Sequence, residues 1–207
     1  NMIRAVAFDL DGTLIDSTDP IVESFQHAFK VIGEPPPSRE VITGSIGYTI
    51  HEQFTHLTRH DPADCVRIYR EHYRTIMCDG TFLLPGARET LEKLRDAGIG
   101  LGFATSKKRE YSEQILEHLG VLDFFTCRLG PDDVTHPKPH PEAVLRSLEE
   151  LGVQAHEMFF VGDTRFDVHA AQAAGVRCLA VATGYATRDE LVRLRPEAVF
   201  DGLIELG

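Results

Sequence analysis

The chain has 207 residues, of which 43% are hydrophobic and 26% charged, a composition typical of a globular protein that excludes a disordered or fibrous one. Its 21 Lys and Arg residues against 32 Asp and Glu residues give a formal net charge of −11, so we expect neither nucleic acid nor an anionic membrane as a partner. No apolar run approaches the ~20 residues of a membrane helix, and we expect no signal peptide. The four cysteines have no paired spacing, which indicates free thiols and a cytoplasmic location.

An apolar run near the N-terminus predicts a buried strand over residues 3–8, and a helical insertion follows it. Residues 17–79 contain no convincing strand but several helical stretches, among them 21–31 and 66–77. Three consecutive prolines at 35–37 interrupt these stretches, since proline breaks a helix. This region therefore differs from the rest of the chain.

The second half alternates amphipathic helices with short apolar runs, and each helix ends at a glycine. Such alternation predicts a doubly wound parallel sheet covered by helices on both faces. We therefore predict an α/β core formed by residues 2–16 and 83–207, with an α-helical cap inserted at 17–82. Val199 and Phe200 suggest a last edge strand. The apolar runs are 99–104, 124–129, 158–161 and 176–182.

Polar side chains follow four of these apolar runs. Because ligands bind at the carboxyl ends of the strands in an open parallel sheet, we expect these side chains to meet at one edge. They are Asp9, Asp11 and Thr13 after the first run, Thr105 and Ser106 after the second, Lys138 after the third, and Asp163 and Asp167 after the fourth.

This set of residues indicates phosphate chemistry. Asp9, Asp11 and Asp163 would repel one another unless a cation lay between them, and hard oxygen ligands suit Mg²⁺. Thr105 and Lys138 would supply a hydrogen bond and a positive charge to phosphoryl oxygens. One carboxylate can attack phosphorus, and the one two positions on can act as acid and base.

The same residues, in their order along the chain, resemble the four motifs of the haloacid dehalogenase superfamily. The similarity covers residues 2–16 and 83–207 and is greatest to the phosphoglycolate phosphatase and pyrophosphatase-like branch, which carries a helical cap. Asp11 favours phosphate chemistry, because the dehalogenases themselves lack this second aspartate. The matching residues are Asp9-x-Asp11-x-Thr13, Thr105, Lys138 and Gly162-Asp163-x-x-x-Asp167.

The resemblance implies a role for each of these positions. Asp9 would be the nucleophile and Asp11 the general acid and base. Mg²⁺ would be held by the Asp9 carboxylate, the Asp11 main-chain carbonyl and Asp163, while Asp167 and Thr13 would form hydrogen bonds around these ligands. Phosphate would be bound by Thr105, Ser106, Lys138 and the backbone at Leu10 and Asp11, since Gly12 allows a turn that gathers N–H groups.

We therefore predict a magnesium-dependent phosphatase that acts on a small phosphorylated metabolite, a phosphoglycolate-like ester or pyrophosphate. A phosphomutase of the β-phosphoglucomutase type is the nearest alternative. A non-enzymatic phospho-acceptor module uses a similar set of groups but lacks a cap and the second aspartate. No surface stripe indicates an oligomeric state.

Substrate selection is expected from the cap, where Gly47, Tyr48 and Thr49 follow a glycine-rich segment, with Arg39 a further candidate. Thr49 could instead begin a helix, with Glu52 completing a capping box. Ser106 and Asp163 could likewise be helix caps, although capping alone would not explain Asp167.

Other charged residues allow a simpler interpretation. Lys107, Lys108 and Arg109 are expected in the first turn of a helix, either as a solvated run or as a local attraction for an anionic substrate. His56 and His60 have no obvious carboxylate partner, which favours a solvated face over a zinc site. Acids offset the remaining cap arginines, which are Arg59, Arg67, Arg70 and Arg74.

Overall fold

The computed structural model describes residues 2–206, and its centre is a six-stranded sheet. The strand order is β5-β4-β1-β6-β7-β8, and every neighbouring pair is parallel. β1 lies in the middle with β4 and β6 beside it, so the order reverses there, as in a doubly wound fold. The predicted fold class and the edge strand β8 are confirmed. The strands are β1 (Ala5–Phe8), β4 (Gly100–Ala104), β5 (Cys127–Leu129), β6 (Met158–Gly162), β7 (Arg177–Val181) and β8 (Ala198–Phe200).

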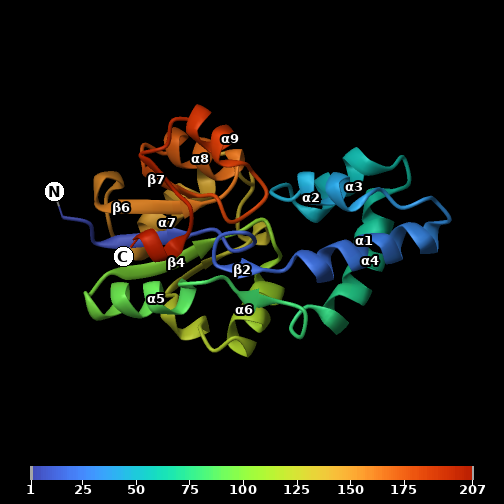
Figure 1. Cartoon of the computed structure of the whole chain (residues 1–207), viewed down its shortest axis with the longest axis horizontal. Coiled ribbons are helices and arrows are strands. Elements are labelled where there is room, and N and C mark those ends of the chain that lie inside the picture. The colour runs from blue at the N-terminus through green and yellow to red at the C-terminus, as the bar shows by residue number, and fades with distance from the viewer. Residues whose placement is uncertain (1, 207) are drawn as a thin grey trace.

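Helices cover both faces of the sheet (Figure 1). Val6 and Phe8 of β1 belong to the core cluster that includes residues of α5 and α6, whereas Ala5 and Ala7 belong to the cluster with α7 and α8. This alternation follows from the two-residue period of a strand, and both faces are apolar because both are buried. The helices are α5 (Ala87–Asp96), α6 (Arg109–His118), α7 (Glu142–Leu151), α8 (Arg165–Ala173) and α9 (Arg188–Arg193), and 3₁₀ turns span Leu122–Phe124, Pro131–Asp133, Ala155–Glu157 and Leu203–Leu206.

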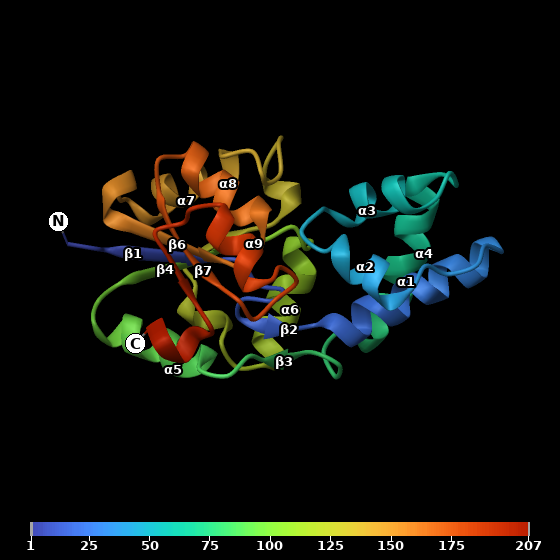
Figure 2. The ribbon, with the colours of Figure 1, turned by 45° about the horizontal axis from the view of Figure 1, so that its top comes forward.

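A separate group of helices lies beyond one end of the sheet (Figure 2). We call α1–α4 the helical unit. The chain leaves and rejoins the sheet region through two short antiparallel strands, β2 (Ile15–Asp16) and β3 (Phe82–Leu83), which the sequence did not predict. Each has only two residues, too few to show a periodicity. The helices are α1 (Thr18–Ile32), α2 (Arg39–Gly44), α3 (Ile50–Leu57) and α4 (Pro62–Ile76).

Two strands begin later in the chain than the apolar runs predict. The first strand begins at Ala5 rather than Ile3. The run at 124–129 contributes only three residues to the sheet, because its start closes locally into a 3₁₀ turn in which Phe125 N–H donates to the Leu122 carbonyl at 3.1 Å.

The structure bears on the expected absence of a membrane helix and on the expected free cysteines. Within residues 2–206, no helix has both the length and the apolar character needed to cross a membrane. The four cysteines are free, as predicted. The cytoplasmic location stays a prediction.

Aromatic packing holds the helical unit together. Phe25 of α1 is fully buried, and its ring centroid lies 4.6 Å from that of Phe54 and 5.0 Å from that of Tyr69. These residues come from three different helices, so one side chain joins α1, α3 and α4. Aromatic pairs of this kind add to the free energy gained by burial.

We expect Phe25→Ala to lower the free energy of unfolding by about 3–5 kcal/mol, because it leaves a cavity between the three helices. Urea denaturation followed by circular dichroism measures this change. Val31→Ala, which truncates a half-exposed side chain on the same helix, serves as control. An equal loss in both variants would contradict this account of the packing.

Candidate active site

The segment after β1 turns sharply at the carboxyl edge of the sheet. Asp9 N–H donates to the Val161 carbonyl at 2.9 Å, so Asp9 is still held by the neighbouring strand. Leu10 N–H points back to Asp9 Oδ1 at 2.7 Å. Gly12 has φ +83°, a conformation that other residues rarely adopt, and this lets the chain reverse after Asp11.

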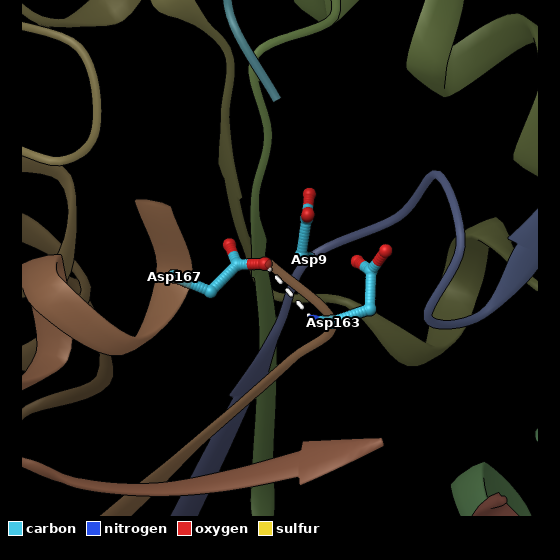
Figure 3. Close-up of side chains that lie close together, drawn as sticks. All are labelled: Asp9, Asp163 and Asp167. Carbon is cyan, nitrogen blue, oxygen red and sulfur yellow. Dashed lines mark hydrogen bonds between the residues drawn. The ribbon is translucent and has the colours of Figure 1, made fainter. Parts of the chain in front are cut away.

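Three carboxylates meet at this edge. Asp9, Asp163 and Asp167 each offer an oxygen, and these oxygens lie within 4.8 Å of one another. Figure 3 shows Asp9 between the other two, with Asp163 at the end of β6 and Asp167 on α8. All three side chains are buried, so water screens their repulsion poorly. The sequence-based expectation that these positions converge is confirmed by the geometry.

Lys138 is the positive group in this cluster. Its ammonium lies 2.6 Å from Asp167 Oδ1 and 3.3 Å from Asp9 Oδ1, and it donates to the Ala104 carbonyl at 3.0 Å. Burial alone would lower the pKa of Lys138, but the charges of Asp167 and Asp9 outweigh it and hold the pKa above its ordinary value. Lys138 is therefore charged and neutralises part of the cluster.

The remaining negative charge is uncompensated. Burial, followed by the charge of Asp167, raises the pKa of Asp163 to about 8. Burial also raises the pKa of Asp9 well above its usual value, with the charges of Asp167, Asp163 and Asp11 acting in the same direction and Lys138 opposing them. Raised pKa values of this kind are typical of functional sites, where several charged groups are buried close together.

Two hydrogen bonds and the close approach of two glycines fix the position of the Asp163 carboxylate. It accepts hydrogen bonds from the Thr13 hydroxyl at 2.9 Å and from Tyr185 N–H at 3.3 Å. A Cβ at Gly184 would lie 1.7 Å from Asp163 Oδ2, and one at Gly12 would lie 2.3 Å from the same atom. The two glycines are required because no side chain fits there. The sequence analysis did not identify Gly184 or Tyr185, which follow β7.

Both oxygens of Asp167 are engaged. Oδ1 is bound by Lys138, while Oδ2 accepts from Thr164 N–H at 3.1 Å, the Thr164 hydroxyl at 3.1 Å and Asp163 N–H at 3.0 Å. Asp167 therefore does cap the start of α8, where Thr164 rather than Asp163 is the N-cap residue. Capping alone does not explain Asp167, as expected, because its other oxygen contacts Lys138.

Asp11 lies at the mouth of the cluster with its own partners. Ser17 Oγ donates to its carboxylate, and the Lys107 ammonium is 3.3 Å away. Lys107 in turn donates to the Tyr73 hydroxyl and lies 4.4 Å above the centre of the Tyr73 ring. Lys107 is buried, so the expectation of a solvated run is wrong for it. Helix α6 begins only at Arg109, which leaves the two lysines before its first turn.

Thr105 and Ser106 have different surroundings at the end of β4. Thr105 lines the pocket beside Asp9, and its hydroxyl accepts from Lys107 N–H at 3.0 Å. The Ser106 hydroxyl donates to the Gly47 carbonyl of the helical unit at 2.8 Å. Ser106 is not a helix cap, since Lys108 occupies that position in α6. Ser106 thus forms a contact between the helical unit and the sheet edge.

Gly47 and Tyr48 line the pocket from the helical unit, facing Asp9 and Asp11. The Tyr48 ring packs edge-on against Phe166 with centroids 4.6 Å apart. Thr49 has another role: its hydroxyl accepts from Glu52 N–H at 3.2 Å, and the Glu52 carboxylate accepts from Thr49 N–H at 3.0 Å. The capping-box alternative is therefore confirmed for Thr49.

Three expectations about the other charged residues of the helical unit need correction. His60 does have a carboxylate partner, Asp64, whose oxygen lies 2.8 Å from the ring nitrogen. Arg39 forms an exposed ion pair with Asp19 at 2.6 Å and is not among the residues that line the pocket. Arg70 does line it, so it is not simply an offset surface charge.

The fold and the site together define an α/β enzyme with an acidic centre at the switch point of its sheet. Residues 6–181 match the family model for haloacid dehalogenase-like hydrolases, and the chain belongs to this family. It is 34% identical over 212 aligned positions to a phosphoglycolate phosphatase of Yersinia pseudotuberculosis, covering 99% of this chain and 91% of that protein. A phosphoglycolate phosphatase of Salmonella choleraesuis is 31% identical with the same coverage.

Solved structures agree with this assignment. A haloacid dehalogenase-like hydrolase from Bacteroides fragilis superposes with a TM-score of 0.93 at 30% identity, covering 99% of this chain and all 100% of that one. The protein CbbY from Rhodobacter sphaeroides, solved in complex with phosphate, superposes with a TM-score of 0.88 at 25% identity, covering 100% and 97%. The predictions of this family, of its α/β fold and of a phosphatase are confirmed by these matches.

We expect Gly184→Ala to lower phosphatase activity at least ~100-fold, because the new methyl group displaces the Asp163 carboxylate and a small misplacement at a reacting centre is costly. Steady-state kinetics measures this loss. The matched control is Gly44→Ala, since a Cβ at Gly44 meets nothing within 4 Å. Full activity of Gly184→Ala would contradict the close approach described for Asp163.

The charge cluster also predicts a pH dependence of stability. A folded-state pKa of about 8 for Asp163, against 3.8 as its ordinary value, means that the folded state binds more protons between these limits. The contribution of Asp163 to the free energy of unfolding therefore falls as pH rises from about 4 to about 8. In a chelating buffer, the stability of the wild type relative to Asp163→Asn should fall by at least ~2 kcal/mol over this range. A constant or rising difference would contradict the shift.

Proposed function

We propose that the chain hydrolyses a small phosphate monoester of the phosphoglycolate type, or pyrophosphate, through a phosphorylated Asp9. The observation that carries this proposal is the arrangement of Asp9: a buried carboxylate beside one lysine and two further aspartates, with Asp11 at the mouth of the same pocket. Relatives named phosphoglycolate phosphatase match the chain over 99% of its length, which supports this substrate class.

The charge of the cluster supports a divalent cation as cofactor. Asp9, Asp163 and Asp167 carry three negative charges against the one positive charge of Lys138, so two remain when all are ionised. The donors are hard oxygens, which suit Mg²⁺. We propose that the carboxylates of Asp9 and Asp163 and the carbonyl of Asp11 hold it, while Asp167 and Thr13 orient these groups. Bound there, Mg²⁺ would offset the charge of the substrate phosphoryl group.

In the first step, an Asp9 carboxylate oxygen attacks phosphorus and the bond to the leaving oxygen breaks. Asp11 gives its proton to that leaving oxygen, which departs as an alcohol from an ester or as phosphate from pyrophosphate. Lys138 and the Thr105 hydroxyl, both at the sheet edge beside Asp9, interact with the phosphoryl oxygens as their charge grows. The backbone N–H of Asp11 assists in holding the same oxygens, and that of Leu10, which donates to Asp9 Oδ1 in this structure, would join it once Asp9 is engaged with phosphorus.

In the second step, water attacks the phosphorylated Asp9. Asp11, now ionised, takes a proton from the water as its oxygen bonds to phosphorus, and the bond to Asp9 breaks. Inorganic phosphate and the free Asp9 carboxylate result. The Lys107 ammonium, 3.3 Å from the Asp11 carboxylate, holds this carboxylate in the pocket.

We also propose that residues 17–82 are a cap that excludes water while Asp9 is attacked. The pocket is lined jointly by Asp9 and Asp11 at the sheet edge and by Gly47, Tyr48 and Tyr69 of the helical unit, which supports this division. Ser106 contributes through its contact with Gly47 rather than by reaching the phosphate directly.

We expect Asp9→Asn to abolish magnesium-dependent phosphate release, by at least ~1,000-fold, because the amide oxygen is a poor nucleophile. Phosphate release is measured colorimetrically, and circular dichroism checks that the variant is folded. Substantial turnover by Asp9→Asn would overturn the assignment.

The fate of the phosphoryl group separates the phosphatase from the alternative functions. Acid quenching during turnover, followed by mass spectrometry, should find a phosphoryl group on the peptide that contains Asp9. Formation of an isomer from a sugar phosphate, without phosphate release, would instead identify a phosphomutase. Accumulation of stable phosphoprotein without turnover would identify a phospho-acceptor module.

A further inference from the structure

Arg70 of α4 brings a positive charge to the pocket without a partner in the described chain. It is half-buried and lines the pocket beside Tyr69 and Tyr73. Within residues 2–206 it forms no ion pair and no side-chain hydrogen bond, whereas Arg67, one turn earlier, is paired with Asp64 at 2.7 Å. An arginine that faces a pocket and has no acid beside it is available to a ligand.

The other cations around the pocket are already engaged. Lys107 is bound to Asp11 and Tyr73, and the Lys108 ammonium lies 3.5 Å from Glu110. Lys138 is bound among the buried carboxylates. Arg70 is therefore the cation of the pocket that has no counter-charge among residues 2–206.

Arg70 and the carboxylates reach the pocket from different parts of the molecule. Asp9 and Arg70 line the same pocket, Asp9 from the segment after β1 and Arg70 from α4. Figure 2 shows β1 within the sheet and α4 in the helical unit beyond it. A substrate whose phosphoryl group lies at Asp9 would thus extend its leaving part toward α4. Apolar side chains, Ile21 and Ile46 among them, also line this pocket, so a charge in it is weakly screened.

We propose that Arg70 is a specificity-determining residue that binds an anionic group on the leaving part of the substrate; this inference rests on the proposed phosphatase function. Its guanidinium stays charged at every physiological pH and presents a planar fork of N–H donors that matches a carboxylate or a phosphate. The chain as a whole is acidic, with a net charge of −11, so such a substrate needs a local positive group to enter.

If Arg70 binds an anionic group, its loss should affect charged and uncharged substrates differently. Phosphoglycolate carries a carboxylate on its leaving part and pyrophosphate a second phosphate, whereas 2-hydroxyethyl phosphate has the size of phosphoglycolate but an uncharged hydroxyl in its place. Arg70 touches the part of the substrate that does not react, so its loss should raise KM more than it lowers kcat.

We expect Arg70→Gln to raise KM for phosphoglycolate at least ~10-fold and to change kcat/KM for 2-hydroxyethyl phosphate less than ~2-fold. Arg70→Lys, which keeps the charge but loses the fork, should fall between wild type and Arg70→Gln. Comparing kcat/KM of the wild type for phosphoglycolate and for pyrophosphate identifies whether the anionic group is a carboxylate or a phosphate. Unchanged thermal unfolding of Arg70→Gln confirms that the variant is folded.

Arg74→Gln is the matched control, because it removes the same charge from the same helix at an exposed position that does not line the pocket. An equal rise of KM in Arg74→Gln would overturn the inference and indicate a general effect of charge. Equal losses for the charged and uncharged esters in Arg70→Gln would overturn it while the phosphatase function stands. Absence of phosphate release from every substrate by the wild type would overturn the proposed function and this inference with it.

Discussion

The repulsion among Asp9, Asp163 and Asp167 is the constraint on which the rest of the structure depends. Three carboxylates with oxygens within 4.8 Å of one another and a single lysine cannot all be ionised at low energy away from water. The excess charge is relieved either by a proton or by a cation, and burial together with the charge of Asp167 raises the pKa of Asp163 to about 8. A fold that holds such a cluster gives up stability at this point, as functional sites commonly do.

Holding the cluster requires the backbone to approach it closely from several strands. Gly12 and Gly184 come from segments that follow β1 and β7, and both lie against the Asp163 carboxylate. The Thr183 hydroxyl donates to the Gly12 carbonyl at 2.8 Å, so these segments also bind each other. The sheet order, with β1 beside β6 and β6 beside β7, makes this meeting possible. Topology thus determines the site as much as the acidic side chains do.

This dependence explains what the sequence can and cannot predict. The carboxylates and Lys138 were predictable, because each follows an apolar run and a parallel sheet brings such positions to one edge. Gly184 was not, since its contribution is the absence of a side chain and depends on a neighbour in space. Lys107 was missed for a related reason: within a run of three basic residues nothing distinguishes it, and its burial depends on Tyr73, 34 residues earlier in the chain.

The contacts of the helical unit with the sheet region are unequal on its two sides. Near β2 and α1 the apolar core is continuous, since Leu14, Ile15 and Ile21 belong to one buried cluster that extends from the sheet into the unit. On the side of Gly47, the contacts include the Ser106 hydrogen bond, the packing of Tyr48 on Phe166 and a hydrogen bond from Arg165 to the Tyr48 hydroxyl at 3.3 Å.

A movement that opens the pocket would separate the Gly47 side first, because the continuous apolar core lies on the other side. The contact of Lys107 with Tyr73 of α4 crosses the same boundary, whereas the contact of Lys107 with Asp11 lies within the sheet region, so opening would separate only Tyr73 from this lysine. Closure would then restore the contact of Tyr73 with Lys107. In this way the hydrophobic side of the unit would position the polar side, and the proposed chemistry at Asp9 would depend on both.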